Sequence, residues 1–442
     1  MIKGLLILLL ACIGNAEWWV ILVNRWHSTR RRHSRLRLSR RLHDVGVLLF
    51  PPFIFVAAGL GTNGLLNGGH ISDLSTPVRY LLYITLAGLV PFFWSVLRWQ
   101  LQRPSQRLLF SESVRFNVLE ELKHSTVYPP AKSLSAAVAT TSEVELTPAE
   151  KRHHSSNDVT SDRPPQDWFS VRGHRRSLLA RFPGNEIYHL EVTRKCLRIG
   201  PGSSDPQCPV RRMKVAHFSD VHMLGCPGRT FYDFATSKLC ELKPDLFLFT
   251  GDLLDDEAML PCAVEMFQEL ADVAPGFFIL GNHDWHLDDS RIRRDLCGTG
   301  WIDISGTHQT IEAAGQKILI AGSEAPWMGD NPQVPVRGDE DVRILLSHAP
   351  DQRNYAVQAD FDLMLSGHNH GGQVVLPVIG PVYSPSRFGV RYAGGTYHHR
   401  SLTMHVSRGL AAKDCLRWNC SPEVSLLHLE ICRPENSCSG TA

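Results

Sequence analysis

Three long apolar runs in the first hundred residues dominate the hydropathy pattern of the chain. They cover residues 4–23, 46–62 and 80–97. At about 1.5 Å per residue, twenty helical residues cross a hydrocarbon core of about 30 Å. The pattern therefore predicts an anchor of three transmembrane helices within residues 1–100. A signal peptide is the alternative for the first run, but Trp18 and Trp19 stand where a small-residue cleavage site would be needed.

A basic segment separates the first two runs. It holds eight arginines, at positions 25, 30, 31, 32, 35, 37, 40 and 41. Such a run can be a nucleic-acid patch, but short basic loops between spans stay in the cytoplasm. We therefore expect a multi-pass protein of the inner or plasma membrane, with the lipid bilayer as its partner and no nucleic acid. Arg98, Arg103 and Arg107 after the third run predict that the rest of the chain also faces the cytoplasm.

The chain changes character after the anchor. Residues 101–185 are largely polar and rich in Ser, Thr, Pro and Glu, which predicts a polar, partly disordered linker. In residues 186–432, short apolar runs alternate with stretches of helical spacing, which predicts a layered α/β domain. Residues 433–442 are expected to form a tail.

Five of the apolar runs in this domain end in potential metal ligands. Continuous apolar runs of this length are typical of strands buried on both faces. In α/β folds the ligand site lies beyond the carboxyl ends of such strands. We therefore expect these side chains to meet at one edge. The candidates are Asp220, His222, Asp252, Asn282, His283, Asp284, His348, His368 and His370.

Carboxylates and imidazoles together favour manganese, iron or zinc over calcium or a thiolate site. Seven or more ligands are too many for one ion and suit two ions that share a carboxylate. Paired ions about 3.5–4 Å apart clamp a phosphate oxygen, and they lower the pKa of water so that hydroxide is available near neutral pH. Gly251, Gly281 and Gly367 each precede a candidate ligand, where a sharp turn leaves no room for a Cβ.

Overall composition adds little to this picture. The formal net charge of +2 indicates no particular partner. The chain has eleven cysteines without regular spacing, which is unlike a disulfide scaffold, so most are expected to be reduced. Cys415, Cys420, Cys432 and Cys438 could bind zinc, but their spacings match no tight ligand pair.

Five motifs occur in order, each after a predicted strand: Asp-x-His, Gly-Asp, Gly-Asn-His-Asp, a single His and Gly-His-x-His. Over residues 212–410 this order resembles the calcineurin-like metallophosphoesterase superfamily. The resemblance implies a four-layer αββα sandwich in which His283 protonates the leaving group and Asp284 orients His283. It implies one ion on Asp220, His222, Asp252 and His370, and a second on Asp252, Asn282, His348 and His368.

Together with the anchor, the domain resembles the transmembrane metallophosphoesterases. It is more distantly similar to the UDP-2,3-diacylglucosamine hydrolases of lipid A synthesis, which are the alternative. Hydrolysis of a phosphodiester or pyrophosphate in a lipid-linked or membrane-proximal substrate is the expected activity, because a soluble nucleotide needs no tether. A non-catalytic scaffold of the same fold and a transporter or sensor built on the helices are the alternatives of other classes.

Other polar residues near the motifs have structural explanations. Asp255, Asp256 and Glu257 are expected at a helix start, where the helix dipole favours acids. His217 lies within a predicted strand and is expected to be a buried core residue. His398 and His399 are expected in a late hairpin.

Overall fold

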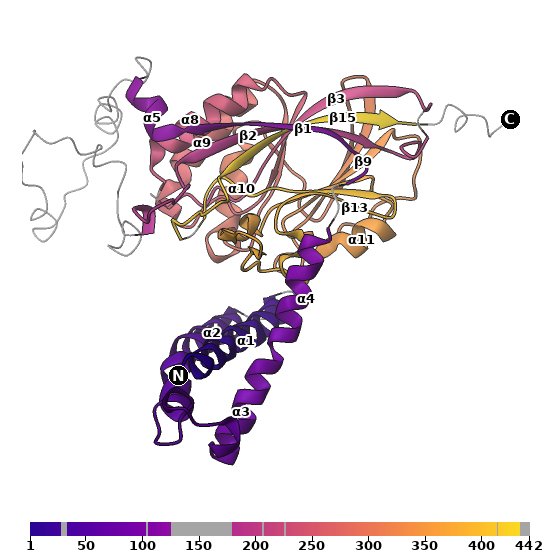
Figure 1. The fold of residues 1–442 in the computed structure, drawn as a ribbon. Helices are drawn as coiled ribbons and strands as arrows, with labels where there is room; N and C mark the ends of the chain where they lie inside the picture. The colour runs from indigo at the N-terminus through magenta and orange to yellow at the C-terminus, as the bar shows by residue number, and fades with distance from the viewer. Residues whose placement is uncertain are drawn as a thin grey trace, which may run out of the picture.

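The structure is a computed structural model that describes residues 1–27, 33–102, 105–124, 179–205, 207–224, 227–412 and 414–433. Figure 1 shows a group of helices from the N-terminal part of the chain and, at one end of it, a layered α/β domain. The greater part of the expected linker, residues 125–178, and most of the expected tail lie outside the described residues.

The described residues of the anchor form four α-helices. They are α1 (Ile2–His27), α2 (His33–Ile54), α3 (Thr76–Ala87) and α4 (Leu89–Gln100). A π-helical turn, η1 (Phe55–Gly59), continues α2 past two prolines, which cannot donate the usual helical hydrogen bonds. By length and composition three stretches can cross a membrane: Ile2–Trp26, Leu42–Gly59 and Thr76–Gln100. The three predicted apolar runs thus lie within helices long enough to span a membrane, and the chain is a membrane protein.

Small residues let the anchor helices approach one another closely. A Cβ added to Gly14 would collide with the carbonyl of Thr85, and one added to Gly88 with the carbonyl of Gly14. Helices in lipid gain their stability from such contact, since water does not drive them together. Leu48, by contrast, faces outward and is 74 % exposed, as a side chain in contact with acyl chains should be.

The domain contains two large sheets. The larger runs in the order β1-β2-β15-β3-β4-β5-β6 and the smaller in the order β13-β14-β10-β9-β8-β7. The strands of the larger sheet are β1 (Leu108–Asn117), β2 (His189–Ile199), β3 (Val210–Phe218), β4 (Leu246–Thr250), β5 (Gly276–Ile279), β6 (Ile302–Asp303) and β15 (Glu423–Cys432). Those of the smaller are β7 (His308–Ala313), β8 (Gln316–Ser323), β9 (Val342–Ser347), β10 (Leu363–Ser366), β13 (Gly395–His399) and β14 (Leu402–Val406).

Alternation along β4 shows how the layers stack. Leu246 and Leu248 join the core between the two sheets, while Phe247 and Phe249 join the core under the helices. The helices on that side are α8 (Arg229–Glu241), α9 (Leu260–Ala271) and α10 (Asp289–Cys297). The outer face of the smaller sheet packs against α11 (Arg353–Gln358). The predicted αββα order is therefore confirmed (Figure 1).

The first strand of the larger sheet lies where a linker was predicted. β1 pairs with β2 in antiparallel register, from Leu108 opposite Leu197 to Asn117 opposite His189, and α5 (Val118–His124) follows it. The linker assignment is therefore wrong for residues 108–124. As an edge strand with most of its side chains exposed, β1 carries polar residues and lacks the continuous apolar run of a central strand.

Strand direction gathers the predicted motifs. β3, β4 and β5 are mutually parallel, and β9 is parallel to β10 in the other sheet. Residues that follow strands of both sheets cluster together, so these carboxyl ends lie at one edge of the sandwich. Two further predictions are confirmed nearby: His217 is fully buried in β3 beside Thr250, and His398 and His399 lie in the β13–β14 hairpin.

Candidate metal centre

The loops after these strands hold an uncommon backbone conformation. Five of their non-glycine residues have positive φ angles: 51° at Asp220, 44° at His222, 57° at Asp252, 69° at His368 and 51° at His370. A left-handed backbone costs a residue with a Cβ about 1–2 kcal/mol. Such strain concentrates at functional sites, where the surrounding structure maintains it. These loops are therefore shaped by the direction in which their side chains must point.

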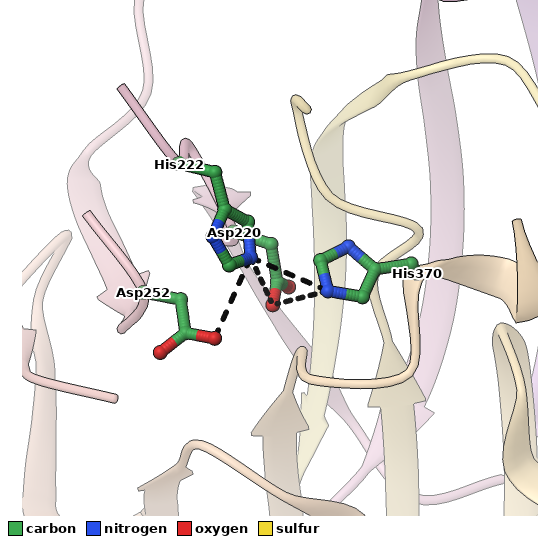
Figure 2. Close-up of side chains that lie close together, drawn as sticks. All are labelled: Asp220, His222, Asp252 and His370. Atoms are coloured by element: carbon green, nitrogen blue, oxygen red, sulfur yellow. Dashed lines mark hydrogen bonds and ion pairs between the residues drawn. The ribbon is translucent and has the colours of Figure 1, made fainter. Parts of the chain in front are cut away.

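One buried cluster unites Asp220, His222, Asp252 and His370 (Figure 2). The Nε2 atom of His222 lies 3.5 Å from Asp252 Oδ2, 3.9 Å from Asp220 Oδ1 and 3.3 Å from His370 Nε2. His370 Nε2 lies 3.7 Å from Asp220 Oδ1. Two imidazoles and two carboxylates thus point at one small volume from three separate loops.

A second cluster shares Asp252 with the first and adds His348 and His368. His348 Nε2 lies 3.2 Å from Asp252 Oδ2 and 3.1 Å from the side-chain oxygen of Asn282. His368 Nδ1 lies 3.2 Å from His348 Nε2. Asp252 Oδ2, between the two clusters, is buried and has no hydrogen-bond partner among the described residues. The carboxylate of Asp252 therefore stands where it can contact ions on both sides.

Each clustered histidine is held by one ring nitrogen and turns the other toward the cluster. The holding contacts are His222 Nδ1 to Asp255 Oδ2 at 3.1 Å, His348 Nδ1 to Thr250 O at 2.8 Å, His368 Nε2 to Pro385 O at 3.1 Å and His370 Nδ1 to Ala411 O at 3.2 Å. Oxygen acceptors require an N–H at the holding nitrogen, so a neutral ring turns a lone pair inward. Metal-ligating histidines are oriented in this way.

The charges of the site also suit cations. Burial alone would lower the pKa of His222, but the nearby carboxylates, led by Asp255, raise that pKa to about 9. Burial likewise opposes protonation of His348, yet the charge of Asp252 raises its pKa to about 9. Buried carboxylates that attract protons this strongly will attract divalent cations for the same reason. The donor set fits two metal ions of the manganese, iron or zinc type.

Two glycines are required by this crowding. A Cβ on Gly281 would overlap the carboxylate of Asp252, and one on Gly367 would overlap that of Asp220. Gly251 has a φ of +91° and packs against the backbone of Gly281. Glycine is therefore required before these ligands, as predicted. At Gly281 and Gly367 a ligand carboxylate leaves no room for a Cβ, and at Gly251 the backbone has a positive φ.

His283 lies at the edge of the first cluster, and its partner is not the predicted one. Its Nδ1 atom contacts Asp255 Oδ1 at 2.5 Å, and its ring stands edge-on to His222 with centroids 4.6 Å apart. The side chain of His283 keeps 15 % of its surface exposed, so its other nitrogen can reach a substrate. The aspartate that orients His283 is therefore Asp255.

Asp284 has a different task, and the prediction that it orients His283 is wrong. Its buried carboxylate accepts hydrogen bonds from the backbone N–H groups of Gly281, Leu253 and Leu254 at 2.9–3.1 Å. It therefore joins the loop after β4 to the loop after β5. Burial, together with the charge of Asp252, raises the pKa of Asp284 to about 6.

Of the acids expected at a helix start, Asp256 holds the capping position and Asp255 does not. Asp256 caps a short 3-10 helix, η7 (Glu257–Met259), by accepting the N–H of Ala258 at 3.1 Å. Asp255 is turned inward instead. The sequence did hold a signal for this role. Asp255 follows the candidate ligand Asp252 by three residues, so its carboxylate lies near the same edge of the sheet.

Arg417 supports the site from the C-terminal segment, and no motif pointed to it. It is fully buried, and its Nη1 donates to the carbonyl of His370 at 2.8 Å. Its Nη2 donates to the carbonyl of Ala411, which also holds the ring of His370. Burial lowers the pKa of this guanidinium. Arg417 thus fixes the loop that carries His370.

A pocket of about 430 Å³ opens over the clusters. Its floor includes His222, Asp252 and His283, and its walls come from two unexpected sources. The first is the segment around the small sheet of β11 (Val375–Leu376) and β12 (Gly380–Pro381), which follows the last motif. The second is the anchor, whose Val23, His43 and Asp44 line the same pocket. No site residue was predicted in the anchor.

Comparison with known proteins agrees with this geometry. The sequence model of the family described as calcineurin-like phosphoesterase matches residues 213–372. The uncharacterized metallophosphoesterase YkuE of Bacillus subtilis is 32% identical over 233 residues, covering 49% of this chain and 79% of that protein. The chain therefore belongs to the calcineurin-like phosphoesterase family, whose members are metal-dependent phosphoesterases.

Two further relatives bear on its activity and its anchor. Phosphodiesterase YaeI of Escherichia coli is 28% identical over 221 residues, covering 49% of this chain and 82% of that protein. A transmembrane protein with metallophosphoesterase domain from Bos taurus is 29% identical over 209 residues, covering 39% of this chain and 45% of that protein. This chain is thus a membrane-anchored metallophosphoesterase with a buried His/Asp metal site.

Proposed function

We propose that this enzyme hydrolyses a phosphodiester bond in a lipid-linked substrate presented at the membrane surface. One observation carries the proposal: the pocket above the His/Asp clusters is walled in part by α1 and α2, which are themselves candidate spans. A substrate whose tails stay in the bilayer enters such a pocket without leaving the membrane. The name of the YaeI relative favours a diester over a pyrophosphate.

We assign the ligands as two sets that share Asp252. One set is Asp220, His222, Asp252 and His370; the other is Asp252, Asn282, His348 and His368. The clustering of their donor atoms and the inward-facing histidine nitrogens support this assignment. When bound, two ions would supply a nucleophilic hydroxide and neutralise charge on the phosphate. The identity of the ions is left to measurement among manganese, iron and zinc.

His283 is the proposed general acid. In the hydrolysis, the water oxygen bonds to phosphorus while the bond from phosphorus to the leaving alcohol oxygen breaks. The ring nitrogen of His283 that does not contact Asp255 donates its proton to that oxygen, and Asp255 at 2.5 Å stabilises the charged ring that precedes the transfer. Burial of Asp255 raises its pKa, but His222 and His283 overcome this and hold that pKa far below its usual value, so Asp255 stays ionised.

We further propose that the catalytic domain faces the cytoplasm. The ends of α1 and α4 that follow each span and the end of α2 that precedes its span all lie beside the domain (Figure 1). These are also the ends that carry the arginines of the sequence, which favours the cytoplasmic side.

The proposal is tested with the full-length protein in lipid nanodiscs. We expect close to two transition-metal ions per chain, hydrolysis of the soluble diester bis-p-nitrophenyl phosphate, and faster hydrolysis of phosphodiester lipids embedded in the disc. Elemental analysis and phosphate release measure these. A protein that cleaves the soluble diester but no lipid would refute the lipid substrate while leaving the enzyme assignment intact.

A further inference from the structure

The anchor contributes functional groups to the catalytic pocket as well as a tether. His43 and Asp44 lie at the start of the second candidate span, about 180 residues before the first metal-centre motif, yet they line the same pocket as His222 and Asp252. Val23 from α1 lies beside them. Polar residues at the end of a span that borders this pocket are placed to contact a group that enters it.

Direct contacts hold this wall against the domain. The side-chain nitrogen of Asn24 in α1 donates to the carbonyl of Ser384 at 3.0 Å. This hydrogen bond joins residues 360 positions apart in the sequence. Gln100 of α4 donates to the carbonyl of Val378 at 2.7 Å. Trp99 packs so closely over Gly380 that a Cβ there would meet its ring. The anchor and the segment around β11 and β12 therefore frame the pocket together.

The pair itself is held in place by the anchor. His43 Nδ1 lies 3.0 Å from Asp44 Oδ1, and the ring of Trp19 stands edge-on to His43 with centroids 6.5 Å apart. Trp19 in turn packs on Gly46, where a Cβ would overlap the indole. The side chain of Asp44 is 76 % exposed and that of His43 is 27 % exposed. Because a carboxylate has about four acceptor sites, Asp44 can accept further hydrogen bonds after its contact with His43.

Carboxylates in the pocket lining outside the metal clusters favour hydrogen-bond donors. A second carboxylate, Asp414, also lines the pocket, and like Asp44 it can only accept hydrogen bonds when ionised. A further phosphate would be repelled by these two groups, whereas a hydroxyl or ammonium group would be bound by them. Near the pocket rim, Val378 and Val382 are 77 % and 46 % exposed, which suits contact with acyl chains next to α4.

We infer that Asp44, supported by His43, is a specificity residue that binds a hydroxyl- or amine-bearing head group of a phosphodiester lipid. The inference rests on the proposed lipid substrate and narrows its class. The phosphate lies over the metal centre, the acyl chains remain in the bilayer, and the head group reaches Asp44. A nucleotide-linked lipid, with its additional phosphate and larger base, fits this pocket poorly.

Two lipids of equal charge test this directly. Full-length protein in nanodiscs is given phosphatidylglycerol, whose head group carries hydroxyls, or phosphatidylmethanol, whose head group has none. A hydrogen bond to a charged group corresponds to roughly a tenfold effect. We expect wild type to favour phosphatidylglycerol about tenfold in kcat/KM, through a lower KM. In Asp44→Ala the ratio of the two rates should fall to about one, and in Asp44→Asn to an intermediate value.

A matched control exists at the other end of the anchor. Asp73 caps a short turn there by accepting the N–H of His70 at 2.8 Å, and it is absent from the residues that line the pocket. Asp73→Ala should keep the wild-type ratio. A wild type without preference, or an Asp44→Ala enzyme that keeps the full preference, overturns the inference. If wild type cleaves bis-p-nitrophenyl phosphate but neither lipid, the lipid substrate fails as well, so the two failures are distinguishable.

Discussion

The metal centre and the anchor wall border one pocket, but they arise in different ways. The metal centre is built from short motifs, each directly after a strand, and strand direction alone brings them to one edge. The wall depends on helices from the start of the chain that pack against a segment near residue 380. The metal-binding chemistry of this enzyme is therefore encoded in short local motifs, whereas access of substrate to the metal centre depends on long-range packing.

The largest effect is expected at the shared ligand of the metal centre. In Asp252→Asn, one formal charge is lost at the atom that faces both clusters, so both ions should bind weakly. Hydrolysis of bis-p-nitrophenyl phosphate should fall at least about a thousandfold. Elemental analysis should find well under two ions per chain. Asp256→Asn is the control, because Asp256 caps a short turn and belongs to neither cluster. Full metal content in Asp252→Asn would contradict the bridging role.

A smaller effect should distinguish the role of Asp255 from that of Asp284, the two aspartates near His283. In Asp255→Asn, the charge that supports protonated His283 is lost, so kcat should fall about a hundredfold or more. The loss should be larger for an alkyl leaving group than for p-nitrophenol, which departs without a proton. Steady-state rates with both kinds of diester measure this.

Asp284→Asn gives the opposite pattern. It weakens the backbone contacts that join two loops, so thermal stability should fall and the two leaving groups should be affected equally. A leaving-group dependence in Asp284→Asn and none in Asp255→Asn would reverse the assignment made from the geometry.

The smallest effect is expected in the wall. Asn24→Ala removes the side-chain donor to Ser384, and a buried neutral hydrogen bond contributes about 1 kcal/mol. We expect a modest drop in the thermal unfolding temperature and a lower rate on embedded lipid. Bis-p-nitrophenyl phosphate hydrolysis should be almost unchanged, because the metal centre does not depend on the link. Equal loss on both substrates would mean that wall and centre are not separable.

Much of the fold was predictable because its central strands are unusually clear. The run Leu246–Thr250 is buried on both faces, as a strand between two packed layers must be. β1 escaped prediction for the opposite reason: it is an exposed edge strand that carries polar residues such as Glu112 and Arg115, and its pairing with β2 places it in the sheet.

The candidate site was predictable to a similar extent as the fold. Motif residues such as Asp220 and His370 were placed together, because each belongs to a strand end. The partner of His283 was misassigned because the family resemblance gave that role to Asp284, whereas in the structure Asp255 contacts the ring of His283. His43 and Asp44 had no signal at all, because a helix in an anchor gives no hint of what its end will contact.

The position of β15 has a consequence for how the enzyme is made. β2 and β3 do not pair with each other; β15, formed by Glu423–Cys432, lies between them. During synthesis the anchor helices can enter the membrane early, yet the larger sheet has a gap between β2 and β3 until residue 432 has left the ribosome. The nascent chain is therefore expected to be tethered to the bilayer before this late strand completes the sheet.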